Sequence, residues 1–246
     1  MVGSDLIKYL NSDFSVTSIT KKNYSEFISK SFDVLVNANG NSKRFWANKN
    51  VLEDFNLSTV SVYKSIFDFR YTIYIYISSS DVYKNHSSPL TTVESIIDGE
   101  GLSAYGLHKY LSETVVKNNC PNYIILRSSM ALGENLRKGP IFDILNNKSL
   151  FISPSSRLQM ITTKELANVI KFLLDQNKTN NVINTGGKGT VSFESIQSYF
   201  SAPVAFSKDT EEQIYEMNVE KLDKLFSLKS SEDYLIEFLN NTQRNG

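Results

Sequence analysis

Hydrophobic and polar positions along the chain switch between two spacings. Apolar residues that recur every three or four positions predict amphipathic helices, and short runs of β-branched and aromatic residues predict buried strands. The predicted helices cover residues 5–10, 24–30, 56–69, 104–118, 164–176, 219–226 and 232–239. The predicted strands cover residues 14–19, 33–36, 71–77, 123–126 and 182–184.

This alternation of strands and helices indicates an α/β fold with a Rossmann-like, doubly wound parallel sheet. Strand 71–77 runs into Ser78, Ser79 and Ser80, so polar side chains are expected at the carboxyl edge, where such sheets bind ligands. Beyond residue 187 the alternation is lost until the last two helices. We therefore expect a sheet domain formed by residues 1–128 and 158–185, and a small C-terminal substrate lobe formed by residues 129–157 and 186–246.

The charge composition argues against several classes of partner. The 246 residues include 26 basic and 26 acidic side chains, for a formal net charge of zero. A nucleic acid or an anionic membrane surface would require a basic surplus, so neither is expected. No apolar run approaches the roughly 18 residues of a membrane span, and no signal-like segment opens the chain, which predicts a cytoplasmic protein. One cysteine excludes an internal disulfide, and two distant histidines do not suggest a zinc site.

Three side chains suit acid–base chemistry: Ser79, Tyr105 and Lys109. The tyrosine and the lysine lie four positions apart at the start of a predicted helix, so their phenol and ammonium groups project from one face. A free phenol titrates near about 10, and a neighbouring cation stabilises its phenolate form. Ser79 follows strand 71–77, where its hydroxyl can orient a substrate carbonyl or alcohol while a cofactor exchanges hydride. A Tyr–Lys pair at this spacing also arises by chance. The prediction of a catalytic site therefore depends on where the pair lies, which is at the start of a predicted helix that follows the strand ending in serines.

Several short motifs follow one another in order along the chain. They are Asn37-Ala38-Asn39-Gly40, Ser79-Ser80-Asp81-Val82-Tyr83, Tyr105-Gly106-Leu107-His108-Lys109, Ile125-Leu126-Arg127 with Gly133, the segment from Met160 to Ala167, and Asn184-Thr185-Gly186-Gly187. In these motifs the sequence resembles the extended short-chain dehydrogenase/reductases, a family of nucleotide-sugar epimerases, dehydratases and reductases. The short first half is most similar to the branch that contains dTDP-4-dehydrorhamnose reductase.

The resemblance implies an NAD(P)-dependent enzyme that acts on a nucleotide-sugar substrate. It implies Ser79, Tyr105 and Lys109 as the catalytic residues; the serine is chosen over its neighbours because it lies four positions before the aromatic Tyr83. The residues implied in cofactor binding are Gly3, Lys21, Asn37, Ala38, Asn39, Gly40, Asn56 and Lys109. The residues implied in substrate binding are Ser80, Asp81 and Arg127.

Two of these assignments leave alternatives open. Arg127 either binds a phosphate or anchors the lobe through a carboxylate. Lys21 follows the predicted strand 14–19, which corresponds to the second strand of the family pattern. A carboxylate there would indicate NAD and a cation suits the 2′-phosphate of NADP, so the cofactor is NAD or NADP with NADP favoured. Family members commonly form homodimers through the helices equivalent to 56–69 and 104–118, and the resemblance implies the same here.

The start of the chain departs from the family pattern. A first strand and a glycine-rich turn should precede the first helix and hold the cofactor pyrophosphate at the helix N-terminus. The residues before Leu6 resemble only the last glycine of that turn, here Gly3. We expect that the true start lies upstream, because loss of a central strand would expose two neighbouring edges; the alternative is that the protein has lost much of its cofactor site.

Three functions therefore remain open. The leading hypothesis is a reductase or epimerase of a nucleotide sugar, with a 4-keto-sugar reductase favoured. The second is a non-catalytic relative that binds a nucleotide or a protein. The third is a sugar-nucleotide dehydratase, which is disfavoured because Ser80 stands where those enzymes carry an acidic aspartate and only Asp81 supplies a carboxylate.

Overall fold

A computed structural model of the chain describes residues 1–41 and 43–243. Its centre is a parallel sheet of four strands in the order β1-β2-β3-β7. These strands are β1 (Ser31–Asn37), β2 (Arg70–Ser79), β3 (Tyr123–Ser128) and β7 (Asn181–Thr185). The α/β class and the parallel sheet predicted from the alternation are confirmed.

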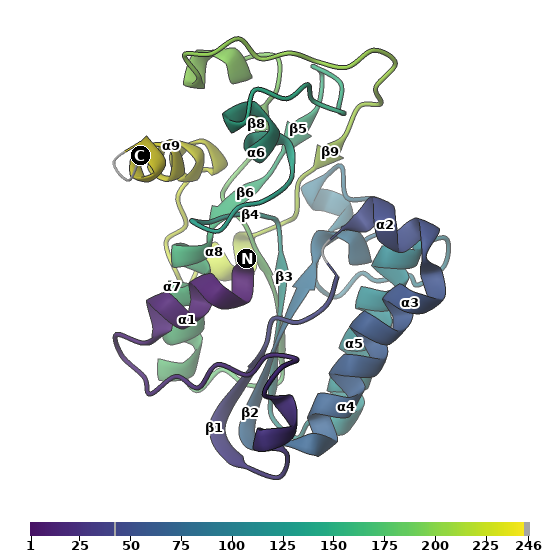
Figure 1. Cartoon of the computed structure of the whole chain (residues 1–246), viewed down its shortest axis with the longest axis vertical. Helices are drawn as coiled ribbons and strands as arrows, with labels where there is room; N and C mark the ends of the chain where they lie inside the picture. Colours follow the sequence, from purple (N-terminus) through teal and green to yellow (C-terminus); the bar gives the residue numbers. More distant parts are fainter. Residues whose placement is uncertain (42, 244–246) are drawn as a thin grey trace.

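Helices cover both faces of this sheet (Figure 1). On one face, α1 (Val2–Leu10) and α7 (Thr163–Asp175) pack against odd-numbered β2 residues such as Ile75. On the other, α4 (Ser61–Asp68) and α5 (Ala104–Asn119) pack against the even-numbered Tyr74 and Tyr76. Successive strand side chains point to opposite faces, so the continuous apolar run of β2 supplies both cores.

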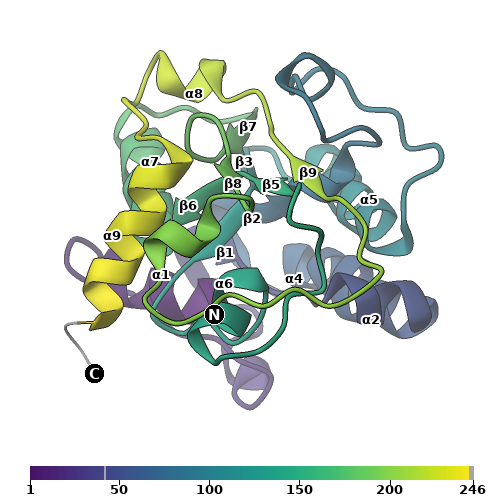
Figure 2. The same ribbon diagram turned by 90° about the horizontal axis from the view of Figure 1, so that it is seen from above.

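The lobe predicted beyond the sheet lies above the carboxyl ends of the strands (Figures 1 and 2). It has its own apolar core, built around buried residues such as Ile141, Phe193 and Leu235. Its elements are β4 (Met130–Leu132), α6 (Pro140–Leu145), β5 (Arg157–Leu158), β8 (Val191–Ser192), η5 (Ile196–Tyr199), β9 (Ile214–Tyr215) and α9 (Ser231–Gln243). β6 (Met160–Thr162), from the segment assigned to the sheet domain, pairs with β4. α8 (Glu220–Asp223) packs against β7, and its Leu222 belongs to the core of the four-stranded sheet. The division of the chain into two domains at the stated boundaries stays a prediction.

Most of the predicted elements are present within one to three residues of their expected bounds, but the strand predicted at 14–19 is wrong. That segment is extended and has no strand partner. Among the described residues, no backbone hydrogen bond joins residues 15–19 to β1, because a cleft separates the two. A segment with the sequence pattern of a strand forms no regular strand unless a neighbouring strand lies within hydrogen-bonding distance.

The first helical layer also differs from the expectation. Residues 24–30 form only a 3₁₀ turn, η1 (Tyr24–Phe27), and the predicted helix 56–69 is a π-helical turn, η2 (Asn56–Val60), followed by α4. Three α-helices were not predicted: α2 (Arg44–Lys49), α3 (Val51–Phe55) and α6. Short 3₁₀ segments η3 (Ser80–Val82) and η4 (Pro89–Thr91) follow β2. Within the described part of the chain, no helix is long and apolar enough to span a membrane.

Candidate active site

Ser79 is the last residue of β2 and is fixed by the turn that follows it. Its hydroxyl donates to a carboxylate oxygen of Asp81, 3.0 Å away, and accepts from the backbone N–H of the same residue at 3.2 Å. This is a local capping arrangement, in which a serine side chain satisfies the first free amide of a helical turn. Ser79 is therefore held in one orientation at the carboxyl edge of the sheet.

Tyr105 reaches the same edge because α5 begins unusually close to η3. Ser103 caps the helix by accepting from the N–H of Gly106 at 3.2 Å. A side chain on Gly106 would place its Cβ only 2.2 Å from the carbonyl oxygen of Asp81, so this close approach requires glycine. The absence of a side chain at Gly106 thus lets α5 bring Tyr105 beside Ser79.

Lys109 completes the group one helical turn later. Its ammonium is buried, donates to the carbonyl of Ile77 at 3.1 Å and lies 5.0 Å from the centre of the Tyr76 ring. Burial raises the pKa of the Tyr105 phenol, whereas the Lys109 charge and the Ser79 hydroxyl both lower it. The cation acts in the direction expected from the sequence, but desolvation outweighs it. The structure therefore brings Ser79, Tyr105 and Lys109 together.

Asp81 links this group to the lobe. One of its oxygens accepts from Arg44 at 2.9 Å and from the Tyr215 hydroxyl at 3.2 Å, while its second oxygen holds Ser79. The Arg44 guanidinium also donates to Gln213 at 3.1 Å and lies 4.9 Å from the centre of the Tyr215 ring. Sequence reasoning missed Arg44 and Tyr215, because they are 37 and 134 positions from Asp81 and belong to no recognised motif.

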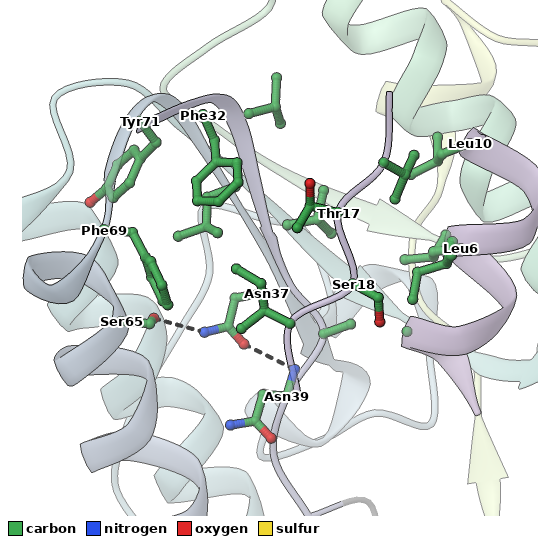
Figure 3. A pocket seen from close by; sticks show the side chains of 18 of the residues that line it. Leu6, Leu10, Thr17, Ser18, Phe32, Asn37, Asn39, Ser65, Phe69 and Tyr71 are labelled. Carbon is green, nitrogen blue, oxygen red and sulfur yellow. Dashed lines mark hydrogen bonds between the residues drawn. The ribbon is translucent and has the colours of Figure 1, made fainter. Parts of the chain in front are cut away.

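A cavity of about 1340 Å³ opens beside this group, along the free edge of β1 (Figure 3). It lies between β1, the extended segment 15–21, α1 and the end of α4. Five of the residues predicted to bind a cofactor line it: Gly3, Lys21, Asn37, Ala38 and Asn39.

The polar end of this cleft is ordered by side-chain hydrogen bonds (Figure 3). Asn37 donates through its amide nitrogen to Ser65 at 3.0 Å and accepts from the N–H of Asn39 at 2.9 Å. Gly40 follows, with φ of +118°, and a Cβ there would lie 3.6 Å from the Lys109 ammonium. The cleft therefore leads toward the Ser79–Tyr105–Lys109 group.

Two predicted residues lie elsewhere. Asn56 is exposed on η2 and is not among the residues that line the cleft. Arg127 is completely buried; its guanidinium pairs with Glu113 at 2.8 Å and donates to the Tyr83 hydroxyl at 2.7 Å. These buried partners occupy the guanidinium, and they belong to α5 and to the segment after β2 rather than to the lobe. The structure therefore contains a carboxylate partner for Arg127, but not the anchor to the lobe that was one of the two open roles.

The remaining substrate-side predictions lie at the turn after β2. Ser80 is the first residue of η3, between Ser79 and Asp81 in the chain, and it is buried. Because this residue is a serine, Asp81 is the one carboxylate of the segment Ser79-Ser80-Asp81, as the sequence indicated. The side chain of Asp81 is 15% exposed, so it lies at the edge of the group rather than in bulk solvent.

Comparison with known proteins gives structural but not sequence relatives. No protein-family model matches the sequence, and no curated protein is significantly similar to it. UDP-galactose 4-epimerase has 16% identity and a TM-score of 0.75, covering 100% of this chain and 96% of that chain. UDP-glucuronic acid 4-epimerase from Bacillus cereus, solved with UDP-glucuronic acid and NAD, has 19% identity and a TM-score of 0.71, covering 98% and 79%.

A third similar structure is dTDP-4-dehydrorhamnose reductase from Bacillus anthracis str. Ames in complex with NADP. It has 16% identity and a TM-score of 0.68, covering 85% of this chain and 81% of that chain. These structures belong to the extended short-chain dehydrogenase/reductases, the family that the sequence motifs resemble. The fold expected from that resemblance is confirmed.

Proposed function

We propose that the protein is an NAD(P)-dependent oxidoreductase or epimerase of a nucleotide-activated sugar, with a 4-keto-sugar reductase as the favoured activity. The observation that carries this proposal is the convergence of Ser79, Tyr105 and Lys109 at the carboxyl edge of the sheet, next to a cleft and beneath a lobe. The enzymes with this fold described above, which act on sugar nucleotides, support the same reaction class.

The side chains divide the proton chemistry between them. Tyr105 exchanges the hydroxyl proton of the substrate, and the hydroxyl of Ser79 holds the reacting oxygen beside it. Lys109 stabilises the phenolate by its positive charge, which opposes the burial that raises the pKa of Tyr105. Without substrate, Asp81 accepts the single proton that the Ser79 hydroxyl can donate, so this hydroxyl must turn from Asp81 to the substrate when it holds a carbonyl oxygen.

The residues around the cleft fit a nicotinamide dinucleotide. The cleft exceeds the roughly 300–1,000 Å³ of most small-molecule sites, and α1 lines it along its length, from Gly3 in the first turn to Leu10. Lys21 would serve a cofactor phosphate, which favours NADP, and Lys109 would bind the nicotinamide ribose next to Gly40. When bound, the cofactor supplies or accepts the hydride at the sugar carbon.

The direct test is turnover of nucleotide sugars by Tyr105→Phe, with Tyr110→Phe as the matched control. Both changes remove one phenol oxygen from α5, but Tyr110 packs against Gly99 and lies outside the group. We expect a loss of at least about 100-fold in turnover for Tyr105→Phe and little change for Tyr110→Phe. Full turnover by Tyr105→Phe would contradict the proposal.

A non-catalytic nucleotide- or protein-binding role is the second candidate. It is favoured by the cleft itself, because β1 has only β2 as a strand partner among the described residues and leaves its other edge open. A titration with NADPH and NADH is followed by nicotinamide fluorescence and melting temperature. Saturable binding with a rise in melting temperature is expected for the enzyme and for a nucleotide-binding relative, and turnover of a nucleotide sugar separates these two; absence of binding by a folded chain supports a protein-binding role.

We also propose a homodimer formed through α4 and α5. Tyr63 and Phe67 on α4 are 45% and 63% exposed, and their ring centres lie 5.1 Å apart, so together they form an exposed apolar patch on this helix. Sedimentation of the wild type and of a Phe67→Lys variant tests this: a dimer that becomes a monomer in the variant supports it, and a monomeric wild type contradicts it.

A further inference from the structure

A buried carboxylate and a buried imidazole join α3 to α5 one residue before Lys109. His108 Nδ1 lies 2.6 Å from one carboxylate oxygen of Asp54, and the two side chains are only 4% and 0% exposed. A carboxylate accepts hydrogen bonds, so the imidazole is the donor. The Phe55 ring packs edge-on against the imidazole, with 5.4 Å between the ring centres. We call Asp54 and His108 the buried pair; polar groups are costly to bury unless they bond one another, so this contact fixes α3 against α5.

The second oxygen of Asp54 reaches the loop that follows β1. It accepts a hydrogen bond from the side-chain nitrogen of Asn41 at 3.0 Å, and the Ser58 hydroxyl lies 3.5 Å from it. The Asn41 side chain also accepts from the backbone N–H of Lys43 at 2.9 Å and donates to the carbonyl of that residue at 3.2 Å. Asp54 therefore ties the end of the loop to α5 through His108.

The loop that Asp54 holds passes directly beside Lys109. A Cβ on Gly40 would lie 3.6 Å from the Lys109 ammonium, and Asn41 follows Gly40 in the chain. Gly40 has φ of +118°, and glycine gives the backbone freedom to adopt other conformations as well. The position of the loop therefore depends on side-chain hydrogen bonds, among them the bond from Asn41 to Asp54.

We propose that the buried pair positions the loop of residues 37–41 against Lys109 for cofactor binding. This inference rests on the proposed function, in which Lys109 binds the nicotinamide ribose next to Gly40. Neither Asp54 nor His108 lines the cleft, so both act through Asn41 as positioning residues. A loop that is already ordered loses less conformational freedom when a ligand binds. The buried pair therefore contributes to the affinity for the cofactor.

The first test breaks the hydrogen bond on the side of the loop. Asn41→Ala removes the donor to Asp54 and leaves the contact between Asp54 and His108 in place. Titration of the full chain with NADPH is followed by nicotinamide fluorescence, at a temperature where each variant is folded. We expect the Kd for NADPH to rise about tenfold, because a hydrogen bond to a charged group that orders the loop is lost. The matched control is Asn50→Ala: this amide lies between α2 and α3 and donates to the carbonyl of Trp46 at 2.9 Å, so its loss should leave the Kd unchanged.

The second test changes the imidazole. His108→Leu removes the donor to Asp54, whereas His108→Asn keeps an N–H close to the position of Nδ1. We expect His108→Leu to raise the Kd for NADPH about tenfold and His108→Asn to restore most of the affinity. A purely structural role would lower the melting temperature of His108→Leu without changing the Kd of the folded protein. In the Asn41→Ala/His108→Leu double variant the two losses should not add, because both act through the carboxylate of Asp54.

The outcomes separate this inference from the function on which it rests. Unchanged affinity of Asn41→Ala for NADPH, or an equal loss in Asn50→Ala, overturns the positioning role and leaves the proposed function standing. Equal affinities of His108→Leu and His108→Asn do the same. If His108→Leu does not fold, Asn41→Ala and its control decide. If the wild-type chain does not bind NADPH, the proposed function falls and this inference falls with it.

Discussion

The two halves of the candidate site are built very differently. At the end of β2, Ser79, Tyr105 and Lys109 are buried and held by short hydrogen bonds, and α5 approaches so closely that only glycine fits at position 106. Along β1, the cofactor half is a cleft of about 1340 Å³ beside an unpaired strand edge. In the catalytic half, contacts among the described residues hold each side chain in place. In the cofactor half, the described residues leave a cleft between them.

The largest expected effect comes from the scaffold of the catalytic half. Arg127 and Glu113 form a completely buried ion pair at 2.8 Å. Arg127→Met leaves the Glu113 carboxylate without its main partner, which should lower the free energy of unfolding by about 3–5 kcal/mol. Urea-induced unfolding measures this, and a Glu113→Gln/Arg127→Met double variant should recover part of the loss. A loss below about 1 kcal/mol, as for a surface pair, would contradict the rigid scaffold.

Gly106→Ala tests the close approach of α5 to the backbone of Asp81 in η3. The added Cβ would lie 2.2 Å from the backbone carbonyl oxygen of Asp81, and a backbone atom cannot move aside as the end of a side chain does. We expect a stability loss of about 1–3 kcal/mol and a loss of turnover, because Tyr105 is displaced from Ser79. Thermal unfolding and turnover are measured together; normal values of both would show that the approach is adjustable.

Gly3→Ala makes the smallest change and belongs to the cofactor half. A Cβ there would meet only Ala38 at 3.5 Å, an ordinary contact. Because Gly3 lies in α1, alanine should raise the free energy of unfolding by up to about 1 kcal/mol. The same methyl group would narrow the cleft, so affinity for NADPH should fall while stability rises. If the affinity for NADPH and the free energy of unfolding both fell, the cofactor half would be packed as tightly as the catalytic half.

The catalytic half was also the half that sequence could predict. Strand β2 is specified by its own run of β-branched and aromatic residues, and Tyr105 and Lys109 share a face through helical geometry alone. These signals are local, so they do not depend on which other segments surround them. The strand placed three serines at its end, and the family resemblance singled out Ser79 among them because it lies four positions before Tyr83.

The rest depended on contacts between segments far apart in the chain. Residues 14–19 have a strand pattern, but a strand requires a hydrogen-bonding neighbour, and the cleft lies where it would be. The residues next to Arg127 in the sequence do not indicate that Glu113 pairs with its guanidinium. Likewise, the residues next to Asp81 in the sequence do not indicate that Arg44 and Tyr215 donate hydrogen bonds to its carboxylate. Pairings of this kind are set by tertiary packing, which a single sequence does not display.

The open edge of β1 has a consequence for how molecules of this protein meet one another. An unpaired strand edge presents free N–H and C=O groups that can pair with the same edge or with an extended segment of another molecule. Pairing with the same edge gives a closed two-fold dimer, whereas pairing with a different segment does not close on itself and can propagate into open chains. Asp33 is exposed on β1, and a charge on an edge strand is one of the features that oppose such pairing.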